Sequence, residues 1–124
     1  MKTLLVCATL MAIDGDSIRC DGVNMRILGD GAPFEHGVDT PETAHRAKCR
    51  AERMMADLAT RRLNELLAGE GVTVEDSGVI DDLKRPLVTV RLANGRTAGQ
   101  TLIDEGYALR WEPNKKIDWC APDT

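Results

Sequence analysis

The first 28 residues alternate between short apolar runs and turn residues. Residues 3–13 are rich in apolar and β-branched side chains, which predicts a first strand. Asp14-Gly15-Asp16 and Asp21-Gly22 are sequences typical of tight turns. Residues 17–20 and 23–28 are therefore expected to form a second and a third strand. Together the three segments predict a β-meander.

The pattern becomes helical after a long interruption. Residues 29–41 contain three glycines and two prolines without periodicity, which predicts a loop of a length often associated with function. From about Lys48 to Ala68, apolar residues recur at a spacing of three to four and predict a helix that ends at Gly69 and Gly71. The expected apolar face comprises Ala51, Met54, Met55, Leu58, Leu63, Leu66 and Leu67; the expected solvated face comprises Glu52, Arg53, Asp57, Arg61, Arg62 and Glu65.

The second half of the chain predicts two more strands and a short helix. Residues 72–76 and 86–92 have strand-like patterns and are joined by a polar connector that ends in Lys84-Arg85. Asn94-Gly95 predicts a turn, and residues 97–105 predict a helix that ends at Gly106. Five strands with a helix after the third is the order of an OB barrel. We therefore expect one domain over residues 1–124, mainly β with helices (α+β), as a five-stranded Greek-key OB barrel with two or three helices.

Composition and charge restrict the classes of function. The net charge of −4 argues against a basic protein that coats nucleic acid, but permits an enzyme that holds one phosphate locally. Charged residues make up 29% of the chain, and no apolar run approaches the roughly 20 residues of a spanning helix. We expect a monomer with no membrane association. Residues 1–7 faintly resemble a signal peptide, but no small-residue cleavage site follows them.

The four cysteines leave the compartment open. Four buried thiols and two disulfides are equally compatible with Cys7, Cys20, Cys49 and Cys120. A zinc site is disfavoured because no CxxC pair is present. Thiols would suit a cytoplasmic protein, whereas disulfides would indicate a secreted or periplasmic one.

Carboxylates in two separate segments are candidates for chemistry. Asp16 ends a turn and Asp39 ends the long loop, so the two could converge on a hard cation such as calcium. Glu42 follows Thr40-Pro41 and is either part of a helix start or a general base that activates water. Taken one at a time, turn formation and helix capping explain these residues. Their combination with arginines, in contrast, indicates a functional site.

Two arginines could complement the carboxylates. Arg26 lies near the end of an otherwise apolar strand, where it either faces solvent or binds phosphate through its planar fork. Arg85 follows Lys84 at the entrance to a strand, where an exposed loop residue is the simpler explanation. Carboxylates that hold a cation, together with fixed guanidinium groups, are what cleavage of a phosphodiester requires.

The order of these motifs resembles the staphylococcal nuclease-like (thermonuclease) family. The resemblance rests on Asp14-Gly15-Asp16-Ser17, Arg26-Ile27-Leu28-Gly29 and Asp39-Thr40-Pro41-Glu42, and continues to Glu105-Gly106-Tyr107-Ala108. The sequence departs from the family pattern in three ways. Residues 30–37 lengthen the stretch before Asp39, and the family's Asp-x-Tyr-Gly-Arg is here Asp81-Asp82-Leu83-Lys84-Arg85. The family's substrate-stacking aromatic residues near the last helix have no clear match.

The resemblance implies an OB-fold, calcium-dependent phosphodiesterase that acts on DNA and RNA and leaves 3′-phosphate ends. Asp16 and Asp39, with the backbone carbonyl of Thr40, would be the calcium ligands. Glu42 would position or deprotonate the attacking water. Arg26 and Arg85 would stabilise the charge that develops on the phosphorus.

Further residues and alternatives follow from the same comparison. Lys84, Tyr107 and Trp111 are the candidate substrate contacts, although either aromatic residue could instead belong to the core. If the cysteines are oxidised, our hypothesis pairs Cys7 with Cys20 and Cys49 with Cys120. The alternative functions are an OB module that binds nucleic acid or protein without cleaving it, and a calcium-binding or structural domain.

Overall fold

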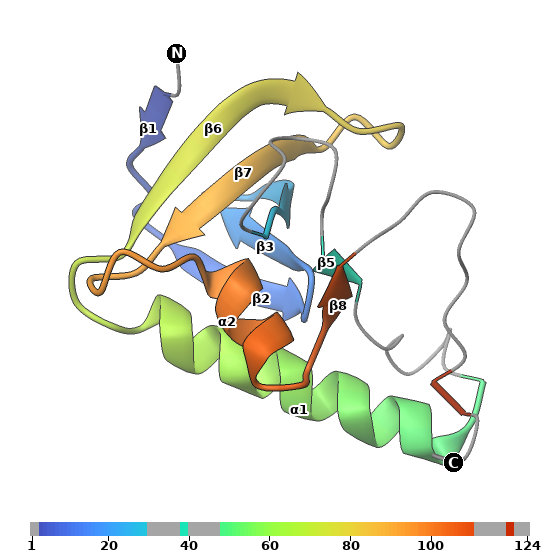
Figure 1. Ribbon diagram of the computed structural model, residues 1–124. Coiled ribbons are helices and arrows are strands. Elements are labelled where there is room, and N and C mark those ends of the chain that lie inside the picture. The colour runs from blue at the N-terminus through green and yellow to red at the C-terminus, as the bar shows by residue number, and fades with distance from the viewer. Residues whose placement is uncertain (1–2, 30–37, 40–47, 111–118, 121–124) are drawn as a thin grey trace.

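The structure, a computed structural model, describes residues 3–29, 38–39, 48–110 and 119–120. These residues form a six-stranded sheet, a separate two-stranded sheet and two helices (Figure 1). The six-stranded sheet curves over the two helices, and α1 runs beneath it along the length of the molecule. The expected α+β class with an OB-like barrel is confirmed.

The large sheet is mixed in direction. Its strands, in spatial order, are β1 (Thr3–Leu5), β6 (Thr73–Ile80), β7 (Pro86–Arg91), β4 (Val23–Ile27), β3 (Ser17–Cys20) and β2 (Leu10–Asp14). Neighbours are antiparallel except for β4 and β7, which are parallel. The meander predicted for the first 28 residues is present as β2, β3 and β4. The parallel pair of β4 and β7 joins the two halves of the chain.

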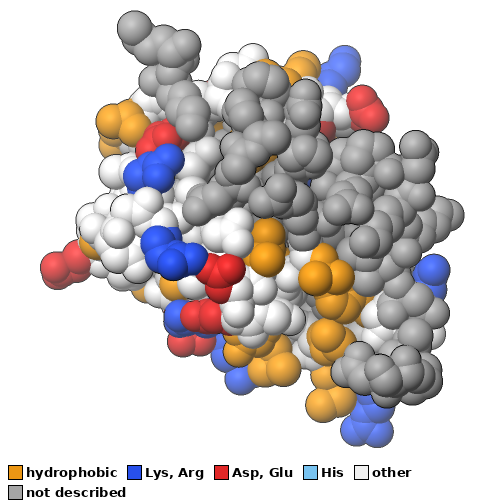
Figure 2. Space-filling view, viewed as in Figure 1, with side chains coloured by type: hydrophobic (Ala, Val, Ile, Leu, Met, Phe, Trp, Pro, Cys, Tyr) orange, Lys and Arg blue, Asp and Glu red, His pale blue; other side chains and the backbone are white. Residues whose placement is uncertain are grey.

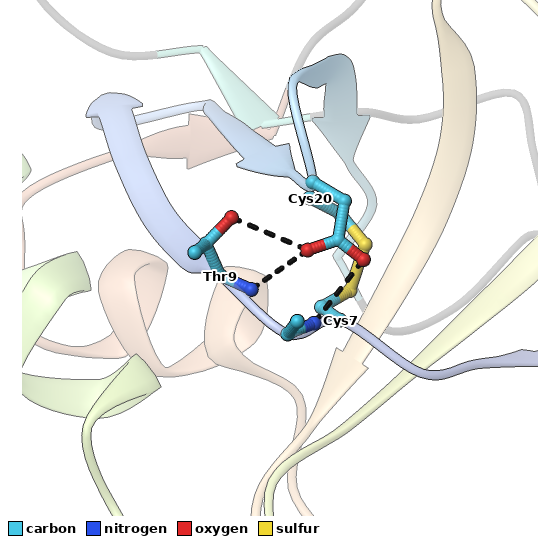
Figure 3. Close-up of a disulfide and its surroundings, with 5 residues drawn as sticks. Cys7, Thr9 and Cys20 are labelled. Carbon is cyan, nitrogen blue, oxygen red and sulfur yellow. Dashed lines mark hydrogen bonds between the residues drawn. A yellow bond between two sulfur atoms is a disulfide. The ribbon is translucent and has the colours of Figure 1, made fainter.

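The expected first strand is two strands, because the chain turns between them. Cys7 is joined to Cys20 by a disulfide with a Cα–Cα distance of 5.2 Å. Asp21 accepts hydrogen bonds from the Ala8 N–H at 3.1 Å and the Thr9 N–H at 2.7 Å (Figure 3). These contacts hold residues 6–9 in a bend that sends β1 to β6 and β2 to β3. The sheet therefore has six strands instead of five.

The two outer strands of the sheet are consecutive in the chain. β1 and β2 lie at opposite edges in the strand order, yet only residues 6–9 separate them. The sheet thus returns on itself as in an OB barrel, although the described residues form no strand pairing between β1 and β2. The free edge of β2 is instead met by α1, where the Ala12 N–H donates to the Asn64 Oδ1 at 2.9 Å.

Helix α1 (Arg50–Leu67) begins and ends close to the expected positions, but its buried face is different. Cys49 is the N-cap, and its Sγ accepts a hydrogen bond from the Glu52 N–H at 3.4 Å. Met54 and Leu58, expected in the core, are 57% and 46% exposed, so that prediction is wrong. The buried residues of α1 are Glu52, Ala56, Ala59, Leu63 and Leu67.

Close packing explains the shifted face of α1. Two alanines on the buried stripe let the helix backbone approach β2, and larger methionine or leucine side chains would hold it away. Glu52 was expected on the solvated face, yet it is only 4% exposed. Its Oε1 accepts a hydrogen bond from the Lys48 N–H at 2.8 Å, which compensates part of the cost of burying the side chain.

Helix α2 (Ala98–Asp104) matches the expected short helix. The Thr97 Oγ1 accepts a hydrogen bond from the Gln100 N–H at 3.0 Å, and Gly106 ends the helix with a φ of 85°. Gly99 lies against the end of β4: a Cβ added there would be 2.4 Å from the Leu28 carbonyl oxygen. The glycine therefore lets α2 support the backbone just before residues 30–37.

The core lies between the sheet and the two helices. Its largest fully buried side chains are aliphatic, as the low aromatic content leads one to expect: Ile18, Ile27, Leu63, Val88, Val90 and Leu102. A second sheet pairs β5 (Val38–Asp39) with β8 (Leu109–Arg110). Among the described residues, no helix combines the length and apolarity that crossing a membrane would require.

Candidate active site

A row of paired residues crosses four strands of the large sheet. Asp14 of β2 pairs with Ser17 of β3, Ser17 pairs with Arg26 of β4, and Arg26 pairs with Leu87 of β7. A register shift between Ala12 and Asp14 places Asp14 opposite Ser17. Because directly paired residues extend their side chains to the same face of a sheet, this row carries the first motif and Arg26 together.

Asp14 organises the turn between β2 and β3. Its Oδ1 accepts hydrogen bonds from the Ser17 Oγ at 2.6 Å and the Asp16 N–H at 3.2 Å. Burial acts to raise the pKa of Asp14, but the hydrogen bonds from Asp16 and Ser17 outweigh it and lower that pKa. Asp14 is therefore ionised at neutral pH and fixes the turn that carries Asp16.

Asp16, in the turn before β3, lies next to Arg26 of β4. The Arg26 Nη1 is 4.0 Å from the Asp16 Oδ2, and the side chains are 19% and 18% exposed respectively. The Ile27 N–H donates to the Asp16 carbonyl oxygen at 3.0 Å, which ties the two segments together. A carboxylate and a guanidinium group are thus brought together in a partly desolvated position that a ligand can still reach.

Arg85 occupies the turn immediately before β7. Its Nε donates to the Asp81 Oδ2 at 2.8 Å, and its side chain is 23% exposed. Burial acts to raise the pKa of Asp81, but hydrogen bonds and the charge of Arg85 lower it overall. Leu87, two residues further on, pairs with Arg26, so both arginines belong to the β4–β7 region.

Lys84 is exposed and has an unusual backbone conformation. Its φ of 63° lies in the left-handed region, which glycine adopts far more readily than lysine. The resembled motif has glycine at this position. The turn before Arg85 therefore takes a glycine-like shape even though the glycine itself is absent.

The second acidic motif begins in the small sheet. Asp39 pairs with Leu109 between β5 and β8, which appear to the right of α2 in Figure 1. Only the backbone of Asp39 is described. Thr40, Glu42 and Trp111 lie outside the described residues, so their expected roles stay predictions.

Tyr107 does not present an open ring on which a nucleic-acid base could stack. Its side chain is half-buried and packs against the core, and its backbone N–H donates to the Leu102 carbonyl oxygen at 2.9 Å. The alternative that Tyr107 belongs to the hydrophobic core thus accounts for much of its environment. Lys84 and Arg85, by contrast, both keep part of their side chains accessible.

The donor set suits a hard cation. Asp16 carries a carboxylate, whose oxygens suit calcium better than thiolate or imidazole ligands do. Within the described residues, no three His, Cys, Asp or Glu side chains gather around one point. Any further ligands would come from the side chain of Asp39 and from Thr40.

Figure 2 shows basic and acidic side chains interspersed on the described surface of one face, and apolar side chains over α1.

Sequence reasoning missed the part played by Asp81. The sequence places Asp81 in a polar connector and at the first position of the resembled Asp-x-Tyr-Gly-Arg motif, without giving it a role. In the structure its carboxylate accepts hydrogen bonds from the backbone and the side chain of Arg85. The available signal was an aspartate four residues before an arginine at a strand entrance. Aspartate side chains often bond to nearby backbone N–H groups in such turns.

The four cysteines form two disulfides. Cys49 is joined to Cys120 with a Cα–Cα distance of 6.1 Å, and Cys7 is joined to Cys20. These are the two pairs of our hypothesis. The Cys49–Cys120 bond attaches the start of α1 to the C-terminal end of the chain, and no cysteine is left as a thiol.

An OB-like barrel that carries a carboxylate in a turn and an arginine on a nearby strand defines a class of small β-barrel proteins with a polar site at the sheet. The family model for staphylococcal nuclease homologues matches residues 36–119, more than half of the chain. The chain belongs to this family. Asp16 and Arg26 precede the matched segment, so their assignment rests on the motifs and on the geometry above. A search of curated proteins gave no match.

Proposed function

We propose that the protein is a calcium-dependent phosphodiesterase that hydrolyses DNA or RNA to 3′-phosphate products. The observation that carries the proposal is the contact between Asp16, in the β2–β3 turn, and Arg26 of β4, whose partly exposed side chains are 4.0 Å apart. Family membership supports a nuclease-type domain, and the matched segment includes Asp39, Glu42 and Arg85. A site of this composition has little use in a purely structural barrel.

Asp16 and Asp39, with the Thr40 carbonyl, are the proposed calcium ligands. The rigid turn around Asp14 supports the role of Asp16, because it fixes the backbone that carries the ligand. Calcium, when bound, would supply positive charge beside the phosphate oxygens. Asp14 would contribute by orientation, since its Oδ1 is already engaged by Ser17 and Asp16.

Glu42 is the proposed general base, and the arginines are the proposed charge stabilisers. Glu42 would take a proton from the water that attacks the phosphorus. Arg26 and Arg85 would donate hydrogen bonds to the phosphate oxygens as negative charge accumulates on them. Both side chains are only 19% and 23% exposed, so water screens their charges less than it would at an open surface.

The substrate would be held along the same region. Lys84, exposed in the turn beside Arg85, would contact a neighbouring phosphate. Tyr107 and Trp111 are the candidate base contacts, with Tyr107 offering only the part of its ring that the core leaves accessible.

A monomer in an oxidising compartment, secreted or periplasmic, fits this proposal. Its support is the pair of disulfides, since such bonds persist mainly outside the cytoplasm. Mass spectrometry of freshly prepared protein without reductant should find no alkylated cysteine. Four alkylated thiols would return the protein to the cytoplasmic alternative.

The decisive experiment compares cleavage of single-stranded DNA with calcium and with a chelator. We expect cleavage only with calcium, and a loss of about 10²- to 10⁴-fold in Glu42→Gln because the base is removed. Glu70→Gln is the matched control, since Glu70 is an exposed glutamate in the connection after α1. Calcium binding without any cleavage by the parent protein would instead identify a non-catalytic binding module.

A further inference from the structure

The turn between β6 and β7 is built around the carboxylate of Asp81. Its Oδ1 accepts hydrogen bonds from the Leu83 N–H at 2.9 Å and the Arg85 N–H at 2.8 Å. Its Oδ2 accepts a hydrogen bond from the Arg85 Nε at 2.8 Å. Main-chain bonds between Asp81 and Arg85 and between Lys84 and Asp81, both 2.9 Å, close the turn. One side chain thus fixes both the backbone and the guanidinium group of Arg85.

This arrangement leaves the outer end of the Arg85 guanidinium group available. In the described part of the chain, neither Nη nitrogen of Arg85 donates a hydrogen bond, since the hydrogen bond to the Asp81 carboxylate comes from Nε. The two Nη groups together form the end-on face of the arginine fork, which can bind two oxygens of one phosphate. An arginine held by Nε therefore keeps the face that suits phosphate.

The anchored turn lies next to the row that contains Arg26. Arg85 directly precedes β7, and Leu87 of β7 is the parallel partner of Arg26. Asp81 is 16% exposed at its side chain, so the ion pair with Arg85 is shielded from most of the solvent. A shielded pair restricts the arginine more strongly than an exposed one would.

We propose that Asp81 is a positioning residue, which holds Arg85 through Nε so that the two Nη groups are presented to the phosphate of the substrate. This inference rests on the proposed nuclease function. Asp81 touches neither substrate nor metal in this scheme and acts only through Arg85. A fixed guanidinium group avoids the cost of ordering a flexible side chain in the transition state.

Asp81→Asn separates positioning from simple turn formation. The asparagine retains an oxygen that can accept the Leu83 and Arg85 backbone N–H groups, but its NH₂ cannot accept from the Arg85 Nε. Asp76→Asn is the matched control. Asp76 lies on β6, the strand that precedes the Asp81 turn, and its carboxylate also accepts a backbone N–H, from Gly78 at 2.9 Å, without an arginine partner among the described residues.

The first test measures kcat and KM on single-stranded DNA with calcium. We expect Asp81→Asn to lower kcat by about 10- to 100-fold with a smaller change in KM, and Asp76→Asn to match the parent. Asp81→Asn should add almost nothing to Arg85→Ala in the double variant, because both remove the same interaction. An unchanged kcat in Asp81→Asn, or fully additive losses, would overturn the inference.

A second measurement keeps the inference testable if the parent protein cleaves nothing, which would defeat the proposed function alone. The NMR signal of the Arg85 Nε–H should be protected from solvent exchange in the parent and in Asp76→Asn, and exposed in Asp81→Asn. Equal exchange in the parent and in Asp81→Asn would show that Asp81 does not hold the arginine. The same spectra report whether each variant is folded.

Discussion

At the scale of the residue, two arginines on neighbouring strands differ sharply in their surroundings. Arg19 of β3 is exposed, and its Nε donates to the Asn24 Oδ1 at 2.9 Å. Arg26 of β4 is 19% exposed and lies beside Asp16. The hydrogen bond of Arg19 links β3 to β4 at the surface. The position of Arg26 keeps a cation next to a carboxylate in a place where solvent is partly excluded.

The Arg26 site predicts that lysine is a poor substitute. Arg26→Lys should lower kcat by roughly 10- to 100-fold, because lysine keeps the charge but lacks the planar fork. Arg19→Lys makes the same change one strand away and should leave kcat unaffected. Initial rates on single-stranded DNA with calcium provide the comparison. A parent-like rate in Arg26→Lys would discard the fork as the reason for arginine.

Local chemistry explains which site residues the sequence could predict. The sequence could indicate the proximity of Asp16 and Arg26, because a turn and a nearby strand are specified by neighbours in the chain. It could not indicate the contact of Asp81, because that contact depends on a side chain that folds back onto Arg85. The predicted roles of Glu42 and Thr40 belong to residues that the structure does not describe, so chemistry must test them.

At the scale of the element, α2 depends on one close approach. Gly99 has no side chain where the helix crosses the backbone of Leu28, and an added Cβ would be 2.4 Å from the carbonyl oxygen. The backbones of α2 and Leu28 cannot move apart without displacing the end of β4. The helix is therefore coupled to the strand that carries Arg26.

Gly99→Ala should destabilise the protein by about 1–3 kcal/mol, despite the higher helix propensity of alanine. Urea unfolding followed by circular dichroism measures the change. Gly69→Ala offers a comparison after α1, where an added Cβ would be 3.3 Å from the Leu66 carbonyl oxygen, and it should cost less. Equal stability of Gly99→Ala and the parent would mean that α2 can move away from β4.

An ion pair links α1 to the residue after α2. The Arg62 Nε donates to the Glu105 Oε1 at 2.7 Å, and the Nη2 donates to the Oε2 at 3.0 Å. The hydrogen bond from Arg62 lowers the pKa of Glu105 below its ordinary value. The side chains are 31% and 35% exposed, so we expect only about 0.5 kcal/mol from the pair.

The lowered pKa of Glu105 gives this pair a definite pH dependence. Its stabilisation is present above the ordinary pKa of glutamate, about 4.3, and is lost as the pH falls through the lower folded-state pKa. Thermal unfolding should show Glu105→Gln to be less stable than the parent near neutral pH, with the difference vanishing in acid. In an Arg62→Ala background the same substitution should have almost no effect at either pH.

Element boundaries were easier to predict than element faces. Turn residues and glycines define both helices within a few positions, but the buried stripe of α1 is set by how closely the helix approaches β2. Periodicity alone favoured the larger apolar residues Met54 and Leu58, which are exposed. The contact selected alanines, a preference that depends on a partner element distant in the chain.

At the scale of the whole molecule, the two disulfides close loops of very different length within the chain. Cys7 and Cys20 are 13 residues apart, and Cys49 and Cys120 are 71 residues apart. Closing the longer loop removes more conformational freedom from the unfolded chain. The Cys49–Cys120 bond also joins a residue inside the matched family segment to the residue just after that segment ends.

Removing each disulfide separately should therefore give unequal losses. The loop-length relation predicts about 3 kcal/mol for the Cys7–Cys20 bond and about 4 kcal/mol for the Cys49–Cys120 bond. The variants are Cys7→Ser/Cys20→Ser and Cys49→Ser/Cys120→Ser, compared by urea unfolding without reductant. A larger loss for the shorter loop would show that contacts near Asp21, and not chain entropy, dominate that bond.

The general architecture could be predicted from the order of the elements, and its division into six strands could not. Strand, turn and helix signals gave a β-meander, a helix and two more strands. The bend between β1 and β2 depends on Cys20, at the end of β3, and on Asp21, in the turn between β3 and β4. Residues 6–9 carry no turn signal of their own.

The hydrogen bond from the Ala12 N–H to Asn64 has a consequence for how copies of the protein behave in solution. An outer strand with unsatisfied backbone groups can accept a strand from another molecule, which is a common start of aggregation and fibril growth. Asn64 occupies such a group on β2 with a side chain. The amide of one helix residue thus helps to keep neighbouring molecules from joining their sheets when the protein is concentrated.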